Sequence, residues 1–457
     1  MLQTMVNAFK IADLRKKILF TLFILLVFRV GSAIPVPFLN SDVFGSIANV
    51  GLLNSDQQNT FLAYLSMMTG DAFNYGTIFA MGITPYINSS IIMQLLTVAI
   101  PALERLQKEG EEGRKKIASI TRYVTVGLGL LQSTAYYFYV RSKDYLGTDV
   151  NGNPFVGNWA IFQAIIIILC FTAGTALIMW LGEQINDKGV GNGISLILFA
   201  GIVARLPTMI TQLFGTQQGY LAHGGPYWFL SPLAGLLYLL MIAYIVLMDN
   251  AERRIPVQYA KRVVGRKMYG GQSTHIPIKV NMGGVMPIIF ASSILSLPPT
   301  IQMFVSSRIE GTSWESFFGI FNQTHWAYAI IYFFLIIGFA YFYASIQYNP
   351  VEMSNNIRKQ SGTIPGIRPG EPTAAYIRKI LSKITLLGAL MISVVAIFPI
   401  LFSQITTVIL EKGFGFSSGM NISLGGTSII IVVGVALETV KQLESQMMMR
   451  HYRGFLD

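Results

Sequence analysis

The sequence IIIILCFTAGTALIMWL fills residues 165–181 and contains no charged side chain. Such a stretch is typical of a membrane-spanning helix, because a hydrocarbon core about 30 Å thick is crossed by roughly 20 apolar residues. The rest of the 457-residue chain has the same character, since 53% of its residues are apolar and only 12% are charged. Soluble proteins carry about twice that share of charged residues. We therefore predict an all-α polytopic membrane protein.

Ten segments of the chain are long and apolar enough to be membrane spans. They lie at about 18–37, 76–100, 117–140, 159–182, 193–214, 228–248, 281–303, 326–348, 381–403 and 427–443. The second and the seventh are weaker, because Gly, Pro and polar side chains interrupt them, and we expect these two helices to face protein or water rather than lipid. Cys170, the only cysteine, lies inside the fourth span, so neither a disulfide framework nor a thiolate metal site is expected.

The basic residues predict the orientation of these spans. Most of the 33 lysines and arginines lie in the N-terminal segment, in the C-terminal tail, or in the connections after the second, sixth and eighth spans. With ten spans, all of these places share one face of the membrane, and the positive-inside rule makes that face cytoplasmic. Both termini are therefore expected in the cytoplasm. The excess of basic over acidic residues is first of all a signal of topology.

Two cytoplasmic loops are longer and more basic than topology requires. The loop at 249–280 alternates β-branched with basic residues and is predicted to form a protruding hairpin. The loop at 349–380 contains G-I-R-P-G at 366–370, which we interpret as a rigid turn that presents Arg368. Basic protrusions of this kind suit an acidic partner, either a protein or the backbone of ribosomal RNA. Neither loop has the interleaved aromatic residues of a base-stacking surface, so sequence-specific reading of nucleic acid is not expected.

The second and seventh spans contain a short internal repeat. G-I-T-P-Y-I-N-S-S at 82–90 and G-V-M-P-I-I-F-A-S at 284–292 share Gly, Pro, Ile and Ser at corresponding positions. Each segment belongs to the second span of a five-span half, and because five is odd, the two halves would enter the membrane from opposite sides. Paired Gly- and Pro-broken spans in inverted halves indicate a pathway at the interface between the halves. Chance recurrence of these residue types in membrane helices is the alternative.

The pathway is predicted to be a channel rather than an ion-coupled transporter. Such transporters usually bury a charge at mid-membrane, whereas the charged residues of these spans lie towards span ends. The two broken spans carry neutral polar groups beside bulky aliphatic residues. A narrow pore segment lined by aliphatic residues excludes water and ions when closed, and it can still widen around a transported molecule. The chain shows no phosphate-binding loop of an ATPase, so the energy for directional movement is expected to come from a partner.

Two other functional patterns were considered. G-F-S-S-G at 415–419 matches a nucleophile elbow, but it has no strand-to-helix context and no nearby histidine, so an intramembrane protease is poorly supported. The long connection at 31–76 ends in the apolar sequence F-L-A-Y-L-S-M-M-T-G at 61–70. This segment is either an ordinary interfacial helix or, beside a pore, a stopper that folds back into it.

Five segments together resemble the SecY family, whose members form the channel of the bacterial Sec protein translocase. They are G-I-T-P-Y-I-N-S-S-I-I-M-Q-L-L (82–96), G-V-G-N-G-I-S (189–195), K-V-N-M-G-G-V-M-P (279–287), G-I-R-P-G-E (366–371) and G-G-T-S-I-I-I-V-V (425–433). The resemblance runs in order along essentially the whole chain. It implies ten helices in two inverted, pseudo-symmetric halves of five, which enclose a central pore with a plug and a lateral gate.

The resemblance also assigns residues to each part of the channel. The pore ring falls on Ile83, Ile87, Ile194, Leu198, Ile289 and Ile431. The plug corresponds to about 59–75, with Thr60, Phe61, Leu62, Tyr64, Leu65, Met67 and Met68. The lateral gate, between spans 2–3 and 7–8, includes Ser89, Ser90, Gln94, Asn281 and Ser292. The residues for partner docking are Arg253, Arg254, Lys261, Arg262 and Arg368.

These assignments imply a protein-conducting channel that passes unfolded preproteins across the plasma membrane and releases membrane helices laterally. The implied partners are SecE-like and SecG-like subunits, a SecA-type motor ATPase, the ribosome, preproteins that carry a signal sequence, and the lipid bilayer. No enzymatic activity, cofactor or metal is expected. The expected regions are 1–17, 18–214, 215–248, 249–280, 281–348, 349–380, 381–443 and 444–457. The external segment at 206–228, rich in Gly and Gln, receives no role.

Overall fold

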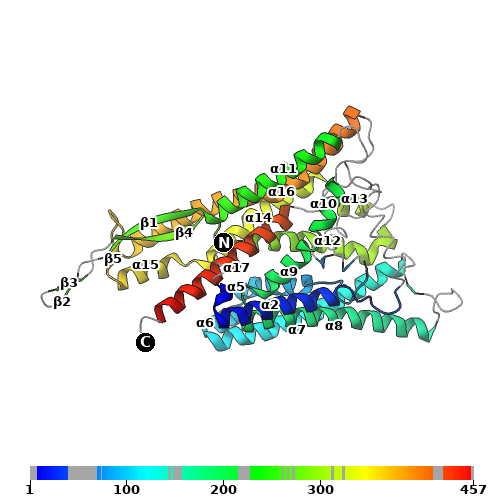
Figure 1. Ribbon diagram of the computed structural model, residues 1–457, viewed down its shortest axis with the longest axis horizontal. Coiled ribbons are helices and arrows are strands. Elements are labelled where there is room, and N and C mark those ends of the chain that lie inside the picture. The colour runs from blue at the N-terminus through cyan, green and yellow to red at the C-terminus, as the bar shows by residue number, and fades with distance from the viewer. Residues whose placement is uncertain are drawn as a thin grey trace.

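We describe the fold from a computed structural model of the chain. The structure describes residues 8–39, 69–70, 72–73, 75–142, 146–147, 157–214, 227–259, 262–264, 267–269, 273–309, 313–321, 325–414 and 426–453. Helices dominate, and a small β-structure protrudes from one end of the helical bundle (Figure 1).

The first half of the chain contains only helices among its described elements. They are α2 (Ala12–Gly31), α5 (Thr84–Ala99), α6 (Pro101–Lys108), α7 (Glu111–Ser142), α8 (Asn158–Lys188), α9 (Gly193–Val203) and α10 (Leu206–Phe214). The helices of the second half are α11 (Tyr227–Asn250), α12 (Met286–Ile309), α13 (Ser313–Gly319), α14 (Trp326–Gln347), α15 (Pro350–Lys359), α16 (Glu371–Phe414) and α17 (Gly426–Arg453). The strands are β1 (Glu252–Tyr259), β2 (Arg262–Val264), β3 (Lys267–Tyr269), β4 (Ser273–Lys279) and β5 (Gly362–Thr363).

Each predicted span coincides with a helix or, for 193–214, with the pair α9 and α10. Within the described residues, four helical stretches are long and apolar enough to cross a membrane alone: Asn158–Lys188, Trp228–Asn250, Trp326–Lys359 and Glu371–Thr406. α5 and α6, which meet at a bend of 100°, would make a fifth span if they are counted together. The structure therefore shows a mostly helical membrane protein with four to five clear spans, and the count of ten stays a prediction.

The second and seventh predicted spans begin later than expected, and for the same reason. Residues 76–83 and 281–285 form bends and turns rather than helix, so the helices begin at Thr84 and Met286. Gly82 and Gly284 have φ angles of 57° and 58°, a left-handed conformation that favours glycine. A proline then follows within the first helical turn, where its missing N–H group costs nothing. Apolar composition alone could not reveal these breaks.

The internal repeat extends from the sequence to the backbone hydrogen bonds. In the first copy, the amides of Tyr86 and Ile87 both donate to the carbonyl of Ile83, each over 3.1 Å. In the second copy, the amides of Ile288 and Ile289 both donate to the carbonyl of Val285, each over 3.2 Å. The two helices therefore start in the same local conformation at corresponding residues, which argues against chance recurrence of Gly and Pro.

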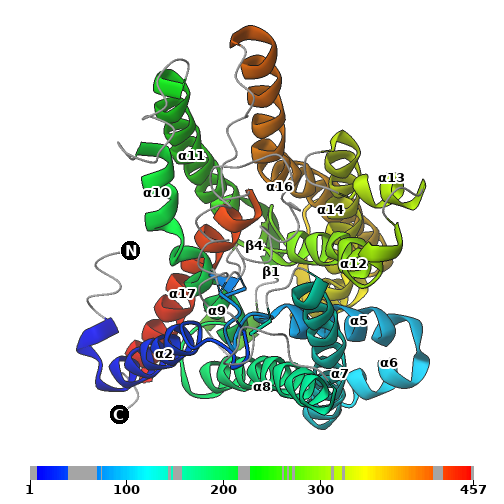
Figure 2. The ribbon, with the colours of Figure 1, turned by 90° about the vertical axis from the view of Figure 1, so that its right-hand side faces the viewer.

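One large hydrophobic cluster joins the two halves. It includes side chains from α2, α5, α8 and α9 of the first half and from α11, α12, α14, α16 and α17 of the second. Figure 2, which looks at the bundle from the end away from the strands, shows α2, α5, α7 and α8 on one side and α11, α12, α14 and α16 on the other. Within lipid, close packing rather than exclusion of water holds such helices together.

The two basic loops form one structure, which we call the arm (the described residues of 252–279 and 350–384). β1 pairs antiparallel with β4, from Glu252 opposite Lys279 to Gln258 opposite Ser273, so the predicted hairpin is confirmed. β5 from the second loop pairs with the far end of β1, which gives the strand order β4-β1-β5. The sequence did not predict this third strand, because two residues are too few to show a period.

The arm has a hydrophobic core of its own. Ile255 and Val257 point to the same side of β1, as the period of two requires, and pack with Ile278, Ile357 and Ile364. α16 supplies Ile377, Leu381 and Ile384 to this core. Farther along, the same 44-residue helix supplies Ile392, Val395 and Ala396 to the cluster between the halves. α16 therefore connects the arm rigidly to the bundle.

Candidate functional site

Six aliphatic side chains predicted to form the pore ring come from four helices of both halves. Ile83 and Ile87 lie at the start of α5, Ile194 and Leu198 in α9, Ile289 in the first turn of α12, and Ile431 in α17. Four of them, Ile83, Leu198, Ile289 and Ile431, are buried members of the cluster that joins the halves, and Ile87 and Ile194 are partly buried and pack against it. One cluster therefore contains or contacts six side chains that are widely separated along the chain.

This cluster has the chemistry of a seal. Isoleucine and leucine side chains offer no hydrogen-bonding atom to water or to an ion, so a narrow passage lined by them empties of water. Leu198 keeps the size and apolarity of its isoleucine neighbours. The assignment of the six residues as a ring stays a prediction, which their common burial supports.

The start of α9 is fixed by two asparagine side chains. The side-chain oxygen of Asn192 accepts hydrogen bonds from the amides of Ile194 and Ser195, at 3.1 and 3.5 Å. The side-chain oxygen of Asn186, near the end of α8, accepts from the amide of Gly193 over 2.7 Å. The first amides of a helix have no partner within it, and asparagine at the N-cap position satisfies them. The position of Ile194 is therefore set by the cap two residues before it.

The predicted gate residues lie on α5, in α12 and just before α12, and α12 contacts both α5 and α7. The Ser89 hydroxyl donates to the Thr121 carbonyl of α7 over 2.8 Å, and the Ser292 hydroxyl donates to the Ile289 carbonyl of its own helix over 3.0 Å. Both hydrogen bonds stay within one half of the chain. Asn281 is buried at the entry to α12, and its side-chain oxygen has no hydrogen-bond partner among the described residues. Ser90 and Gln94 are half-buried on α5.

The seven predicted plug residues lie outside the described residues. They are Thr60, Phe61, Leu62, Tyr64, Leu65, Met67 and Met68. The downstream end of the predicted plug is described and is tied to α7, because the Tyr136 hydroxyl donates to the Phe73 carbonyl over 2.8 Å and the two rings lie 4.6 Å apart. The Phe73 amide in turn donates to the Thr69 hydroxyl over 3.2 Å.

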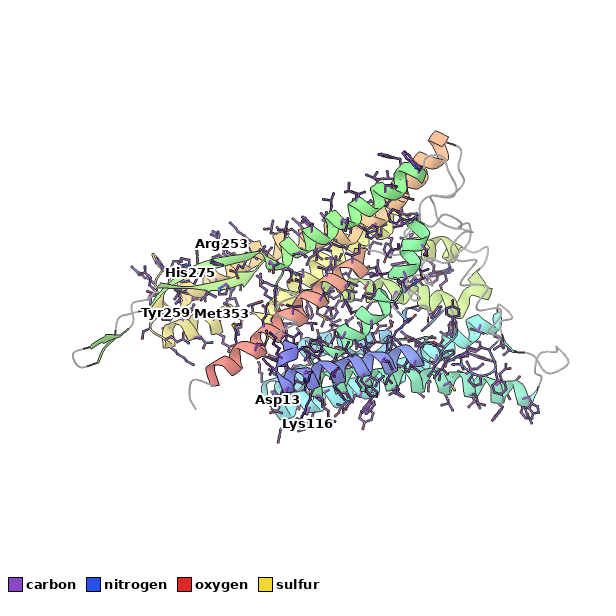
Figure 3. The ribbon with its side chains drawn as sticks, in the orientation of Figure 1. Asp13, Lys116, Arg253, Tyr259, His275 and Met353 are labelled. Carbon is purple, nitrogen blue, oxygen red and sulfur yellow. The ribbon has the colours of Figure 1, made fainter. Side chains whose placement is uncertain are left out.

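The docking residues that can be placed lie on the arm. Arg253 and Arg254 are exposed on β1, and the guanidinium of Arg254 pairs with Glu252 over 2.7 Å. Figure 3 shows Arg253, His275 and Tyr259 on the arm, whereas Asp13 and Lys116 mark the end of the first half nearest to it. Lys261 lies outside the described residues, and the side chain of Arg262 in β2 is not described.

Arg368 lies in the turn between β5 and α16, which several hydrogen bonds hold in place. The Ile367 amide donates to the Ile364 carbonyl over 3.1 Å. The Thr373 hydroxyl donates to the Arg368 carbonyl over 2.8 Å, and the Ser354 hydroxyl donates to the Gly370 carbonyl over 2.7 Å. The predicted turn is confirmed, and these hydrogen bonds hold it. Arg368 therefore lies in a hydrogen-bonded turn of the arm.

Comparisons with known proteins agree with this geometry. The sequence model of the SecY family matches residues 77–440. A protein translocase subunit SecY of Streptomyces galbus is 44% identical over 456 residues, which cover 100% of both chains. The chain belongs to the SecY family. It is therefore a subunit of a protein-conducting channel and a multi-pass membrane protein, and it is not an enzyme.

Two solved structures show the same fold at low sequence identity. A protein-conducting channel is 16% identical and has a TM-score of 0.58, with 95% of this chain and 92% of that chain covered. Sec61 in the canine ribosome–channel complex is 15% identical and has a TM-score of 0.53, with the same coverage. The five sequence segments that resemble the SecY family identified the family correctly, as the family model and the 44% identical relative show.

Two ion pairs among the charged residues near span ends were not predicted for this SecY-family chain. Arg122 of α7 pairs with Glu183 of α8 over 2.7 Å, and Lys441 of α17 pairs with Asp249 of α11 over 2.9 Å. Each pair joins residues that are far apart in sequence, so no local pattern could have indicated it.

Within the described ranges, no group of three or more His, Cys, Asp or Glu side chains could hold a metal ion.

Proposed function

We propose that this channel passes unfolded preproteins across the bacterial plasma membrane and releases membrane helices sideways into the lipid. A SecA-type motor ATPase or a ribosome supplies the driving force, and SecE-like and SecG-like subunits complete the channel. The observation that carries the proposal is one hydrophobic cluster that joins the two halves and contains or contacts all six aliphatic side chains. Three of the six, Ile83, Ile87 and Ile289, lie at the two repeated helix starts, where inverted halves place a pathway.

In this proposal the six aliphatic residues are a ring that closes around the passenger. An extended polypeptide displaces the side chains of the ring, which then fill the space around it as a gasket and limit the leak of ions. Aliphatic side chains suit this role because they make no hydrogen bond that a passenger of variable sequence would have to break.

The gate opens where α12 separates from α5 and α7. The hydroxyl hydrogen bonds of Ser89 and Ser292 support this proposal, because each stays within its own half and survives the separation. Asn281, buried at the start of α12, has a side-chain oxygen without a hydrogen-bond partner in the part of the chain that the structure describes. Burial of such an atom costs about 1–3 kcal/mol, and in this proposal opening of the gate relieves that cost.

The arm is the docking surface for the motor ATPase or the ribosome. Arg253, Arg254 and Arg368 lie on one rigid body, so one acidic surface can engage residues from both loops. β1 follows α11 after one residue, β4 leads through the bends and turns at 280–285 into α12, and the Val280 amide donates to the Ala251 carbonyl over 2.9 Å at the base of the hairpin. A load on the arm is thereby passed to α12.

The proposed topology has ten spans and both termini in the cytoplasm, on the side of the arm. Ala8 and Leu14 from the N-terminal region pack against Leu443 of α17, so the two ends of the chain meet at one end of the bundle. The basic residues of the arm and of the terminal segments also fall on this side, as the positive-inside rule requires.

The proposal is tested by reconstitution into proteoliposomes with a SecE-type partner. SecA, ATP and a preprotein with a signal sequence are added, and protection of the preprotein from protease is measured. We expect protection only when ATP and an intact signal sequence are both present. If the preprotein stays accessible to protease while a known translocase imports it in the same lipids, the proposed transport activity is wrong for this set of subunits.

A further inference from the structure

A short helix that the sequence analysis did not single out carries an aromatic face. Trp314, Phe317 and Phe318 lie on α13, and Phe321 follows just beyond its end. The spacing i, i+3 and i+4 places Trp314, Phe317 and Phe318 on one side of the helix. The centroid of the Phe317 ring lies 5.9 Å from that of Trp314, and 5.6 Å from each of the other two. The four rings form one continuous patch, which we call the α13 patch.

The α13 patch faces away from the bundle. Trp314 is 60% exposed and Phe317 is 46% exposed. α13 contacts α12 and lies at the rim of the bundle, beside α12 and α14 and at the end away from the arm (Figures 1 and 2). α12, which α13 contacts, exposes Ile301, and α14, which follows α13 in the chain, exposes Ile330. The neighbouring helices therefore also carry apolar side chains on their surfaces, as expected of a multi-pass membrane protein.

The tryptophans of the chain indicate where the membrane boundaries lie. Trp159 and Trp180 are both exposed on α8, and the stretch of helix between them is about 32 Å long, close to the hydrocarbon thickness of about 30 Å. Tryptophan favours this boundary because its ring is apolar and its N–H group can still reach water. Trp326 is exposed at the first turn of α14, the helix that follows α13.

We propose that α13 is an interfacial helix that lies in the lipid headgroup layer on the membrane face away from the arm, with the α13 patch inserted among the upper acyl chains. The occupant of the patch is therefore lipid. A helix with an aromatic face, too short to span the bilayer, binds in this manner. Because α13 joins α12 to α14, it would fix the depth of α12, the helix that contacts α5 and α7 across the proposed gate.

The test uses the full chain reconstituted with its partner subunits in vesicles of phosphatidylcholine. One variant keeps Trp314 and replaces Trp159, Trp180, Trp228 and Trp326 by phenylalanine. Its fluorescence is measured in lipids brominated near the headgroup and in lipids brominated deep in the acyl chains. A control variant replaces all five tryptophans and carries Leu169→Trp, because Leu169 is exposed midway between Trp159 and Trp180.

We expect the shallow bromines to quench Trp314 about twofold more than the deep bromines do, as is typical of a headgroup-level ring, with the reverse order for Leu169→Trp. Quenching of Trp314 by aqueous iodide without quenching by either bromolipid would place the patch in water and overturn the proposal. Quenching by neither reagent would show that a protein subunit covers the patch, and would also overturn it.

A second measurement tests the position of the patch without replacing several tryptophans, so that it does not depend on the folding of the tryptophan variants. In a Cys170→Ala background, Trp314→Cys is labelled with a nitroxide, and its accessibility to oxygen is compared with that to a water-soluble nickel chelate. We expect access to both reagents, which is typical of the interface. Access to the nickel chelate alone would contradict the proposal, and Trp326→Cys, at the start of α14, is the matched control.

Discussion

Ile87 and Ile289 occupy corresponding positions in the two copies of the repeat, and each amide donates to a carbonyl at the start of its helix. This equivalence could be found from the sequence, because Gly, Pro and Ile recur at fixed spacing. The assignment of Ile194, Leu198 and Ile431 to the same cluster could not be found from spacing, since these residues lie in helices without a repeat partner. Their places came from the resemblance to the SecY family, and the structure then showed the common cluster.

Replacing both Ile87 and Ile289 by serine should raise the resting ion conductance of the channel severalfold. The hydroxyl groups would let water enter a passage that the aliphatic side chains keep dry. The measurement is single-channel leak in planar bilayers. Ile92→Ser with Ile301→Ser is the matched control, because these two isoleucines are exposed on the same two helices. Equal leak from the two double variants would contradict the proposed ring.

Tyr136→Phe should loosen the downstream end of the proposed plug. The variant removes the hydrogen bond from the Tyr136 hydroxyl to the Phe73 carbonyl, which still accepts from the Gly76 amide over 3.3 Å, so we expect a cost of about 1 kcal/mol in local stability. Faster hydrogen exchange at residues 72–77 would report this loss. Tyr123→Phe on the same helix is the control, since Tyr123 is 80% exposed. Unchanged exchange in Tyr136→Phe would mean that the hydrogen bond does not hold this segment.

At the scale of helices and strands, an element can be predicted from the sequence when it is long enough to show a periodic pattern of side chains. The hairpin of β1 and β4 was predicted because its β-branched residues alternate over many positions. β5 has two residues and α13 has seven, which are fewer than the 11–18 or so over which a helical period is recognised in sequence. The starts of α5 and α12 were missed because turns at Gly82 and Gly284 have the same apolar neighbours as the helices that follow.

Asn192→Ala should disturb the start of α9. The amides of Ile194 and Ser195 lose their capping acceptor, which costs about 1 kcal/mol. We expect lower thermal stability of the reconstituted channel and increased ion leak, because Ile194 is the second residue after the cap. Asn192→Asp supplies a carboxylate in place of the amide and should restore both properties. If Asn192→Asp behaves like Asn192→Ala, the effect does not arise from capping.

Arg368→Glu should impair ATP-driven export more than it impairs assembly of the channel. The turn that holds Arg368 is fixed by backbone hydrogen bonds, so the reversed charge changes the docking surface and leaves the fold in place. Initial rates of preprotein import and the yield of assembled complex are the two measurements. Arg358→Glu, an exposed position on α15, is the control. Normal import by Arg368→Glu would exclude the proposed docking role.

For the whole molecule, composition was enough to predict a helical membrane protein, but not to count its spans. α9 and α10 divide one predicted span, and α5 reaches the required length only together with α6. Short and bent helices of this kind are stable because the surrounding helices satisfy their backbone groups. Their number in the membrane therefore depends on tertiary packing, which the sequence does not display.

The proposed topology can be tested by labelling with a thiol reagent that does not cross membranes. In a Cys170→Ala background, single cysteines are placed at exposed positions: Lys10, His275 and Met448 on the arm side, and Asn158 at the start of α8. We expect the first three to be labelled only in inverted vesicles and Asn158→Cys only in right-side-out vesicles. Labelling of Lys10→Cys and Met448→Cys from opposite sides would rule out an even number of spans.

α16 is about 66 Å long, more than twice the thickness of the hydrocarbon core, and its N-terminal part and its middle belong to different hydrophobic cores. A tilt of about 10° moves one end of such a helix by roughly 11 Å relative to the other. Helices tilt when the bilayer becomes thinner. The acyl-chain length of the surrounding lipid would thereby adjust how the arm meets its partner, without any change in the arm itself.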